Sequence, residues 1–347
     1  METLVDPAIN ATLAFYRGYL KVFAGSDAAR VLSRPSPVRN TGFDLDLDVL
    51  VREEVATDVV ALTLGGSAPL PSWTPGAHLD VFLPSGAQRQ YSLCGDPSDR
   101  STYRIAVRLV RDGGGGSREV HESVRAGDRL RVRGPRQAFW MVAEPAYLFV
   151  AGGIGITPIL PMVRAAARNG ADWKLVYLGR SRATLPFLDE LAEYGDRVSV
   201  RTDDELGPPD LAAALEGAAP GTAVYMCGPG PLMDTAKELQ RRRDPGARFH
   251  SERFSPPPVR GGEPFAVRVA STGAEVMVGA EETTLQALGR VVPALTYSCQ
   301  QGFCGTCKLR VLDGDVEHRD QRLLDAERAD HFLPCVSRAA GTLVVDL

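Results

Sequence analysis

Short runs of apolar and β-branched residues, separated by Gly- and Pro-rich turns, dominate the chain from residue 44 to residue 143. The clearest runs cover residues 59–64, 79–83, 103–110 and 129–132. No long helical period appears between them. This pattern is typical of an antiparallel β-barrel.

The pattern changes between residues 146 and 254, where short apolar runs alternate with helical stretches. The runs cover residues 147–151, 174–179, 198–201 and 223–227. This alternation predicts an α/β domain with a parallel sheet and helices on both faces.

A Pro/Gly-rich linker at residues 255–263 precedes a third unit, residues 264–347, for which the pattern predicts a small α+β domain. The capping box Thr283-x-x-Gln286 marks the start of a helix, and Asp313-Gly314 predicts the turn of a hairpin. The predicted strands cover residues 265–270, 275–279 and 342–346.

Residues 1–40 form an N-terminal extension with one predicted helix, which begins at Asp6-Pro7, and a linker at residues 33–40. Its apolar residues are spaced by four, three, four and three positions and so share one helical face: Ile9, Leu13, Tyr16, Leu20 and Phe23. We expect this face to pack on the protein itself; the alternative is docking to a partner protein or to a second copy.

Composition narrows the class of protein. The 347 residues suggest two or three domains, and a net charge of −4 gives no electrostatic footprint for nucleic acid. No apolar run is long enough for a membrane span, and the acidic start does not resemble a signal peptide. We therefore expect a cytoplasmic protein, in which the six cysteines stay reduced and serve as ligands or site residues.

Four of these cysteines have a recognisable spacing. Cys299, Cys304 and Cys307 are separated by four and two residues, and Cys335 follows after 27 more. This is the plant-type ferredoxin spacing, which predicts a [2Fe–2S] cluster. A structural zinc site is the alternative, but such sites usually pair their cysteines as C-x2-C twice. The five histidines show no metal-ligand spacing, and we interpret them as structural or surface residues.

A glycine-rich loop at residues 151–158 follows a predicted strand and begins a helix, which is the arrangement that binds a pyrophosphate. Gly153 and Gly155 allow close approach of the backbone, although a tight strand–helix turn alone also needs glycine. Cys227-Gly228-Pro229 falls at the end of a later strand, where parallel sheets bind their ligands.

The carboxylate of Asp203 follows another strand, where it can hydrogen-bond the 2′-hydroxyl of an adenosine ribose and would repel a 2′-phosphate. This position favours NADH over NADPH. Arg180 and Arg182 favour the opposite choice.

A flavin motif is predicted at Arg89-Gln-Tyr-Ser-Leu93, although an ordinary strand is the alternative. An arginine can bind a phosphate, a tyrosine can cover a flat ring, and a serine hydroxyl can hydrogen-bond a ring nitrogen. Residues 113–117 offer a second phosphate cradle of backbone N–H groups, or a flexible surface loop.

With these motifs in order, the chain from about residue 45 resembles the phthalate dioxygenase reductase family. The motifs that carry the resemblance are Arg89-Gln-Tyr-Ser-Leu-Cys94, Gly115-Gly-Ser117, Gly152-Gly-Ile-Gly-Ile-Thr-Pro158, Cys227-Gly-Pro229 and the four cysteines. The N-terminal extension departs from the family pattern. The resemblance implies a flavin β-barrel at 44–143, an NAD domain at 146–254 and a β-grasp ferredoxin domain at 264–347.

The resemblance also implies cofactors and residue roles. FMN is expected rather than FAD, with its phosphate held by Arg89, Gly116 and Ser117. Ser92, Thr157, Cys227 and Phe254 are expected at the reacting rings, Phe254 by stacking on the flavin. The full set for FMN is Arg89, Gln90, Tyr91, Ser92, Val107, Gly115, Gly116, Ser117, Thr157 and Phe254; for NAD it is Gly153, Gly155, Arg180, Asp203, Cys227, Gly228 and Pro229; for the cluster it is Cys299, Cys304, Cys307 and Cys335.

The implied function is the reductase component of a multicomponent oxygenase, which moves electrons from NADH through FMN and the cluster to a terminal oxygenase of the Rieske non-haem iron type. A cytochrome P450 is the alternative acceptor. An alternative of another class is a redox-sensing relay module with a silent nucleotide site.

Charge is concentrated in the last domain, where residues 262–347 carry 12 acidic and 8 basic residues. A solvated face is the simplest interpretation. The alternative is that these acidic residues steer the domain toward a basic patch on the electron acceptor. They are Asp313, Asp315, Glu317, Asp320, Asp325, Glu327 and Asp330.

Overall fold

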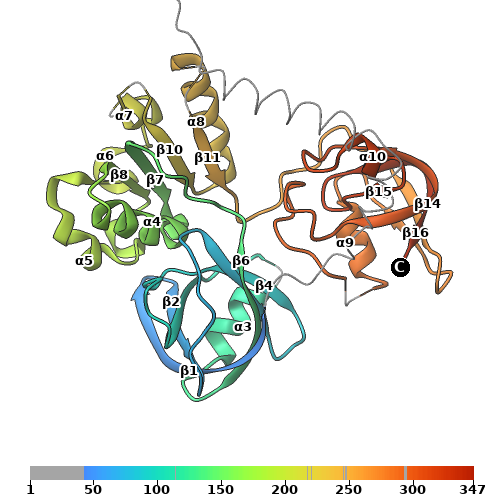
Figure 1. Ribbon diagram of the computed structural model, residues 1–347, viewed down its shortest axis with the longest axis horizontal. Coiled ribbons are helices and arrows are strands. Elements are labelled where there is room, and N and C mark those ends of the chain that lie inside the picture. The colour runs from blue at the N-terminus through green and yellow to red at the C-terminus, as the bar shows by residue number, and fades with distance from the viewer. Residues whose placement is uncertain are drawn as a thin grey trace, which may run out of the picture. The chain divides into compact units, whose positions relative to one another are not determined.

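The computed structural model describes residues 43–347 except 114, 217, 220, 245, 247, 293 and 294. The predicted N-terminal helix and the linker at 33–40 lie outside the described residues. Three separate sheets lie along the described chain, in the order expected from the sequence (Figure 1). No helix of this part of the chain is both long and apolar enough to cross a membrane.

The first sheet has six antiparallel strands in the order β4-β3-β6-β1-β2-β5. An isolated bridge between Leu93, just after β4, and Ile105 in β5 joins the two edge strands, so the sheet closes into the predicted barrel. Buried apolar side chains such as Leu62 and Leu79 fill its core. The strands are β1 (Phe43–Ala56), β2 (Val59–Gly65), β3 (Ala77–Phe82), β4 (Gln88–Ser92), β5 (Thr102–Arg108) and β6 (Arg129–Gln137).

One helix of the barrel, α3 (Gly116–Ser123), was not expected from the sequence, which suggested only a phosphate cradle or a surface loop there. Gly115 precedes the helix with a φ of 79°, a conformation that glycine adopts without strain. Within the helix only Gly116 and Val120 are buried. A single buried apolar side chain gives no helical period to detect in the sequence.

The second sheet is parallel throughout, in the order β11-β10-β7-β8-β9. Its strands are β7 (Ala146–Gly152), β8 (Asp172–Gly179), β9 (Val198–Thr202), β10 (Ala223–Cys227) and β11 (Phe249–Glu252). The first four match the predicted runs. The sequence did not reveal β11 because this short edge strand, Phe-His-Ser-Glu, is mostly polar.

Helices cover both faces of this parallel sheet, as predicted (Figure 1). One apolar cluster includes Ile159 of α4, and a separate cluster includes Leu215 of α7 and Ala236 of α8. The helices are α4 (Ile156–Arg168), α5 (Leu188–Leu191), α6 (Asp203–Leu206), α7 (Leu211–Glu216) and α8 (Gly230–Arg243), with 3-10 turns at Gly153–Gly155, Arg182–Thr184 and Ala192–Arg197.

The third sheet is mixed, in the order β13-β12-β16-β14-β15, with β12 and β16 parallel. The capping box is present: the Gln286 N–H donates to Thr283 Oγ1 at 3.2 Å, and the Thr283 N–H donates to Gln286 Oε1 at 2.9 Å. The elements are β12 (Phe265–Val269), β13 (Glu275–Val278), α9 (Thr284–Gly289), β14 (Leu309–Glu317), α10 (Asp325–Arg328), β15 (His331–Phe332) and β16 (Arg338–Asp346).

The prediction of a hairpin turn at Asp313-Gly314 was wrong. Both residues lie inside β14, where the register with β16 shifts on either side of Asp313. Gly314 has a φ of 102°, and an added Cβ would lie 2.5 Å from the carbonyl oxygen of Thr342. The glycine is therefore needed at an irregularity in the pairing of β14 with β16. Such an irregularity gives the same sequence signal as a turn.

The domain bounds themselves, 44–143, 146–254 and 264–347 with a linker at 255–263, stay a prediction. The three sheets fall within residues 43–137, 146–252 and 265–346.

Substitution of Gly314 by alanine tests this account of β14. We expect Gly314→Ala to destabilise the third domain by about 1–3 kcal/mol, because the new Cβ meets the β16 backbone at an unfavourable φ. Gly289→Ala is the control, since an added Cβ there meets nothing within 4 Å. Thermal unfolding of the two variants measures the difference, and equal midpoints would contradict the assignment.

Candidate functional site

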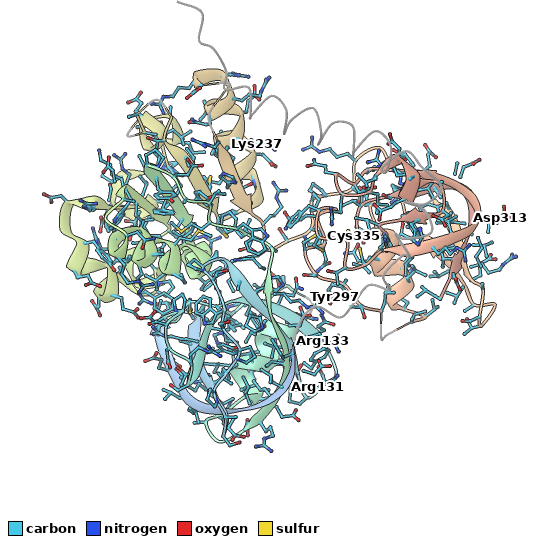
Figure 2. All side chains as sticks on the ribbon, in the orientation of Figure 1. Arg131, Arg133, Lys237, Tyr297, Asp313 and Cys335 are labelled. Carbon is cyan, nitrogen blue, oxygen red and sulfur yellow. The ribbon has the colours of Figure 1, made fainter. Side chains whose placement is uncertain are left out.

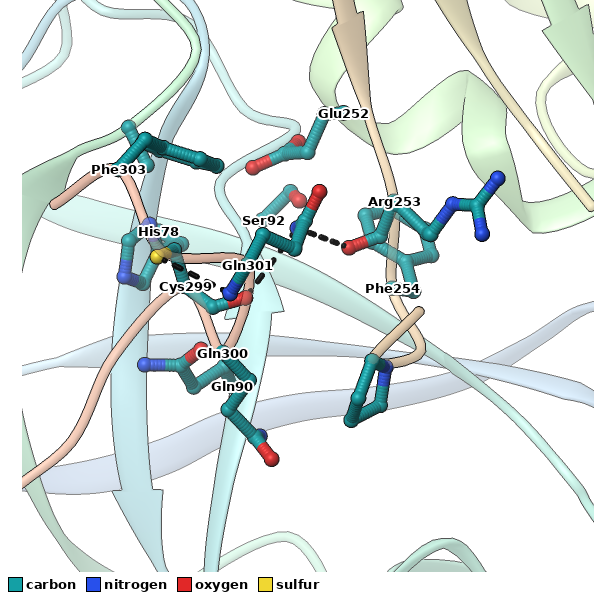
Figure 3. A pocket seen from close by; sticks show the side chains of 12 residues that line it. His78, Gln90, Ser92, Glu252, Arg253, Phe254, Cys299, Gln300, Gln301 and Phe303 are labelled. Atoms are coloured by element: carbon teal, nitrogen blue, oxygen red, sulfur yellow. Dashed lines mark hydrogen bonds between the residues drawn. The ribbon is translucent and has the colours of Figure 1, made fainter. Parts of the chain in front are cut away.

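A cavity lies where the barrel, the end of β11 and the loop of Cys299 come together (Figure 3). It brings the predicted flavin residue Ser92 and the predicted stacking residue Phe254 beside the predicted cluster ligand Cys299. The lining residues are His78, Gln90, Ser92, Ala138, Glu252, Arg253, Phe254, Pro256, Cys299, Gln300, Gln301 and Phe303.

The barrel contributes the flavin motif through β4. Antiparallel pairing with β3 sets Ser92 opposite His78 and Tyr91 opposite Leu79. Tyr91 packs against the barrel core, and burial raises the pKa of its phenol to about 12. Gln90 lines the cavity and donates its Nε2 to Asp80 Oδ1 at 2.7 Å, which fixes its side chain.

Arg89 lies directly against the N-terminus of α3. A Cβ added to Gly116 would lie 2.3 Å from Arg89 Nε, so the glycine permits this approach. The N-cap residue Gly115 offers no side-chain cap, and the first backbone N–H groups of a helix have no partner within the helix. Together with the Arg89 guanidinium they offer donors that fit the phosphate of FMN.

Two other predicted FMN residues serve the fold in this structure. The Ser117 hydroxyl accepts the N–H of Val110 at 3.0 Å, so it holds the loop in front of α3. The side chain of Val107 is buried in the barrel core, and its carbonyl oxygen lies 2.9 Å from His121 Nε2.

The predicted nucleotide loops meet at the carboxyl edge of β7 and β10, which are neighbouring parallel strands. A Cβ on Gly155 would lie 2.2 Å from the carbonyl oxygen of Cys227, and one on Gly152 would lie 2.8 Å from Pro229 Cδ. The glycines are therefore needed for two backbones to pack against each other, and their role at a pyrophosphate stays a prediction. Thr157 is buried and donates its hydroxyl to the Ile154 carbonyl at 3.0 Å.

The predicted ribose residues follow the neighbouring strands β8 and β9. Asp203 and Arg180 are both exposed at that edge. Arg182, the second cation there, forms an ion pair with Glu205 at 2.8 Å, which reduces its attraction for a 2′-phosphate.

One candidate residue escaped the sequence analysis. Glu252 ends β11, pairs in register with Cys227 of β10, and lines the cavity. Burial raises the pKa of its carboxyl to about 8, against an opposing effect of the neighbouring Ser92 hydroxyl. Burial also raises the pKa of the Cys227 thiol well above its usual value. A carboxylate at a strand end, two residues before Phe254, was the signal that could have revealed Glu252.

The four predicted cluster cysteines converge in two pairs. Hydrogen bonding with Cys299 lowers the pKa of Cys304 to about 5. Hydrogen bonding with Cys307 raises the pKa of Cys335. The sulfurs of Cys299 and Cys304 also lie 3.3 and 3.4 Å from the backbone nitrogens of Gln301 and Thr306. All four are free thiols.

The two pairs bear on the two metal sites considered, a zinc ion and a binuclear cluster. Two pairs of thiols fit a binuclear cluster, in which each pair binds one iron. Gly302 and Gly305 have φ values of 79° and 77°, which glycine adopts without strain, and they turn the loop backbone between the cysteines.

Comparison with known proteins identifies the last domain and the family. The sequence pattern of a 2Fe-2S iron-sulfur cluster binding domain matches residues 267–340. A putative toluene-4-sulfonate monooxygenase system reductase subunit from Comamonas testosteroni is 38% identical, covering 88% of this chain and 99% of its own. The structure of a phthalate dioxygenase reductase, described as modular for electron transfer from pyridine nucleotides to [2Fe-2S], is 34% identical with a TM-score of 0.68 and covers 88% of this chain and 98% of its own.

The chain belongs to the phthalate dioxygenase reductase family. The family resemblance, the barrel and the parallel-sheet and ferredoxin domains predicted from the sequence are thereby confirmed. An intact type IV self-sufficient cytochrome P450 monooxygenase is also similar, at 39% identity and a TM-score of 0.69, over 92% of this chain and 44% of that longer one.

The acidic residues of this reductase are less available for steering than their number suggests. Ion pairs join Glu317 to Arg319, Asp320 to Arg328, Glu327 to Lys308 and Asp330 to Arg310. Asp313 lies at the edge of the domain away from Cys335 (Figure 2). Steering by the acidic face stays a prediction.

The pKa of Glu252 predicts how stability depends on pH. Between its ordinary value of 4.5 and about 8, the folded reductase keeps this carboxyl protonated while the unfolded chain ionises it. The folded state then binds one more proton, so stability falls as pH rises through this range. Between about pH 5 and pH 8, we expect the free energy of unfolding to fall by about 1–3 kcal/mol less in Glu252→Gln than in the wild type.

Denaturant unfolding at a series of pH values measures this difference. Glu281→Gln, which removes an exposed carboxyl, is the control and should follow the wild type. Parallel curves for all three proteins would show that Glu252 is ionised in the folded state.

Proposed function

We propose that this chain is the reductase component of a multicomponent oxygenase. In this role it passes electrons from NADH through FMN and a [2Fe–2S] cluster to a terminal oxygenase, of the Rieske non-haem iron type. One observation carries the proposal: a single cavity is lined by Ser92 of the flavin motif, Phe254 beside the nucleotide domain, and the cluster ligand Cys299.

The order of cofactors follows from their chemistry. FMN, when bound, accepts two electrons as hydride from NADH and gives them up singly, which a [2Fe–2S] cluster requires. The protein supplies the positions. Arg89 and the N-terminus of α3 hold the phosphate, and Ser92 offers a hydroxyl to the flavin ring. Phe254, 48% exposed, would stack on the ring.

The nicotinamide side of the site carries little charge. Cys227 is fully buried as a neutral thiol, and Glu252 is protonated at neutral pH by the burial of its carboxyl. Gly155 and Gly228 bring two backbones together at the same strand ends. Asp203 selects NADH through the ribose, and the Glu205 partner of Arg182 weakens the competing cation.

We further propose that the protein is cytoplasmic and that its partner is a protein rather than a nucleic acid. A net charge of −4 supports the second point.

A cytochrome P450 is the second candidate for the acceptor, because the chain is similar to part of a self-sufficient P450 monooxygenase. The relative described as a monooxygenase system reductase subunit, which matches over 99% of its own length, favours a separate oxygenase component. A redox-sensing relay module with a silent nucleotide site would need neither the flavin motif nor the nucleotide loops.

Anaerobic titration of the purified protein tests the function. We expect a flavin band and a broad iron–sulfur absorbance, both bleached by NADH at less than about one tenth of the NADPH concentration needed for the same effect. Bleaching requires both bound cofactors and a working nucleotide site. If both bands are present and neither nucleotide bleaches them, the relay module becomes the better interpretation.

A further inference from the structure

Among the described residues, three hydrogen bonds join the cluster loop to the barrel and to the segment after β11. His78 Nε2 lies 3.2 Å from Ser298 Oγ. The Tyr297 hydroxyl donates to the carbonyl of Gln88 at 3.4 Å, and Gln301 Nε2 donates to the carbonyl of Arg253 at 2.8 Å. These contacts come from residues immediately before and after Cys299.

The His78–Ser298 bond differs from the other two. Both of its partners are side chains, and both are buried, at 5% and 3% exposed. The other two bonds end on backbone carbonyls, which every residue offers. Only the His78–Ser298 bond therefore depends on the side-chain types at both ends, and its burial makes the loss of either partner costly.

The barrel holds His78 firmly in place. Its strand β3 lies between β4 and β6, and the ring stands opposite Ser92 on one side and Arg136 on the other. Arg136 is fixed in turn by an ion pair with Asp80 at 3.2 Å, in which both side chains are buried. Burial and the nearby Arg136 lower the pKa of His78 to about 4, so the ring is neutral at physiological pH.

His78 therefore connects the two ends of the electron path. In the pairing of β3 with β4, His78 lies opposite Ser92 of the flavin motif. Its ring hydrogen-bonds Ser298, which is the residue next to Cys299. In the close view of the cavity, His78 and Cys299 lie on the same side (Figure 3).

We propose that His78 and Ser298 form a positioning pair that fixes the Cys299 loop at the flavin site and thereby sets the rate of electron transfer from FMN to the cluster. This inference rests on the function proposed above. In the step concerned, the reduced flavin loses one electron and one ferric iron of the cluster becomes ferrous. Neither residue exchanges electrons; each acts by holding the loop.

The pair matters because the barrel and the ferredoxin domain are far apart in sequence: His78 and Ser298 are separated by 220 positions. The chain joins the ferredoxin domain to the rest through the segment 255–263, which is rich in Pro and Gly. Electron transfer slows steeply with distance, so a shift of the Cys299 loop away from the flavin site would lower its rate.

Ser298 is the residue to change first, because it is neither a cluster ligand nor a lining residue of the cavity. We expect Ser298→Ala to slow cluster reduction severalfold in stopped-flow absorbance, while NADH–ferricyanide turnover, which needs only the flavin, stays at the wild-type rate. Ser298→Thr keeps the hydroxyl and is the matched control. It should retain a rate close to that of the wild type.

A second readout does not depend on electrons. Hydrogen exchange of the peptide covering residues 295–303, measured on oxidised holoprotein, should be faster in Ser298→Ala and unchanged in Ser298→Thr. His78→Gln places an amide nitrogen at the reach of Nε2 and should preserve slow exchange, whereas His78→Phe keeps a ring without the nitrogen and should lose it. Combining His78→Phe with Ser298→Ala should add nothing to either single change, since both remove the same bond.

Wild-type exchange and wild-type cluster reduction in Ser298→Ala would overturn the proposal, as would equal slowing in Ser298→Ala and Ser298→Thr. If Ser298→Ala loses iron, the exchange comparison of His78→Phe with His78→Gln decides in the same way. A wild-type protein that fails to reduce its own flavin or cluster with NADH would instead overturn the proposed function.

Discussion

Electrons pass between two bound cofactors at a useful rate only when the cofactors lie close together. In this reductase the requirement falls on one cavity, because the flavin motif and the cluster cysteines belong to different domains. Ser92 ends a barrel strand, Phe254 follows the last strand of the nucleotide sheet, and Cys299 lies on a loop of the ferredoxin domain. The strand ends and loops of three sheets therefore have to lie close together, and the packing around the cavity holds them there.

Close backbone approach and low charge characterise the surroundings of this cavity. Gly155 packs against the carbonyl of Cys227, where a side chain would collide. Burial lowers the pKa of His78 and raises that of Glu252 and Cys227, so all three are mainly neutral at neutral pH.

The fixed positive charge stands where a phosphate is expected. Arg89 lies against the first turn of α3, which adds the positive end of a helix dipole. Two further cations near the cavity are paired: Arg136 with Asp80, and Arg253, which lines the cavity, with Asp234. The site thus separates an anion-binding end from a neutral reacting end, in agreement with a ligand that carries a phosphate on one side and a flat ring on the other.

The sequence predicted those parts of the fold that depend on local periodicity. Apolar runs revealed β7, β8 and β10, and the Thr283 capping box marked the start of α9, because each signal lies within a few adjacent residues. It failed for α3, with one buried apolar residue, and for β11, which is polar. Asp313-Gly314 misled because a glycine at positive φ suits a strand irregularity as well as a turn.

The candidate site shows the same division. The cysteine spacing and the Arg89 motif were visible because their chemistry is written in short segments. Glu252 and the His78–Ser298 bond were not, since each acquires its role from a residue far away in the sequence. A histidine on a strand gives no sign that it will contact the neighbour of a cluster ligand 220 residues later.

The most direct test of this account is a single-turnover stopped-flow experiment, in which NADH is mixed anaerobically with the oxidised protein and the flavin and iron–sulfur absorbances are followed separately. The account predicts that the flavin is reduced first and that the cluster follows in a second phase whose rate does not depend on the NADH concentration. Cluster reduction that precedes the flavin phase, or that proceeds unchanged in protein stripped of flavin, would contradict it.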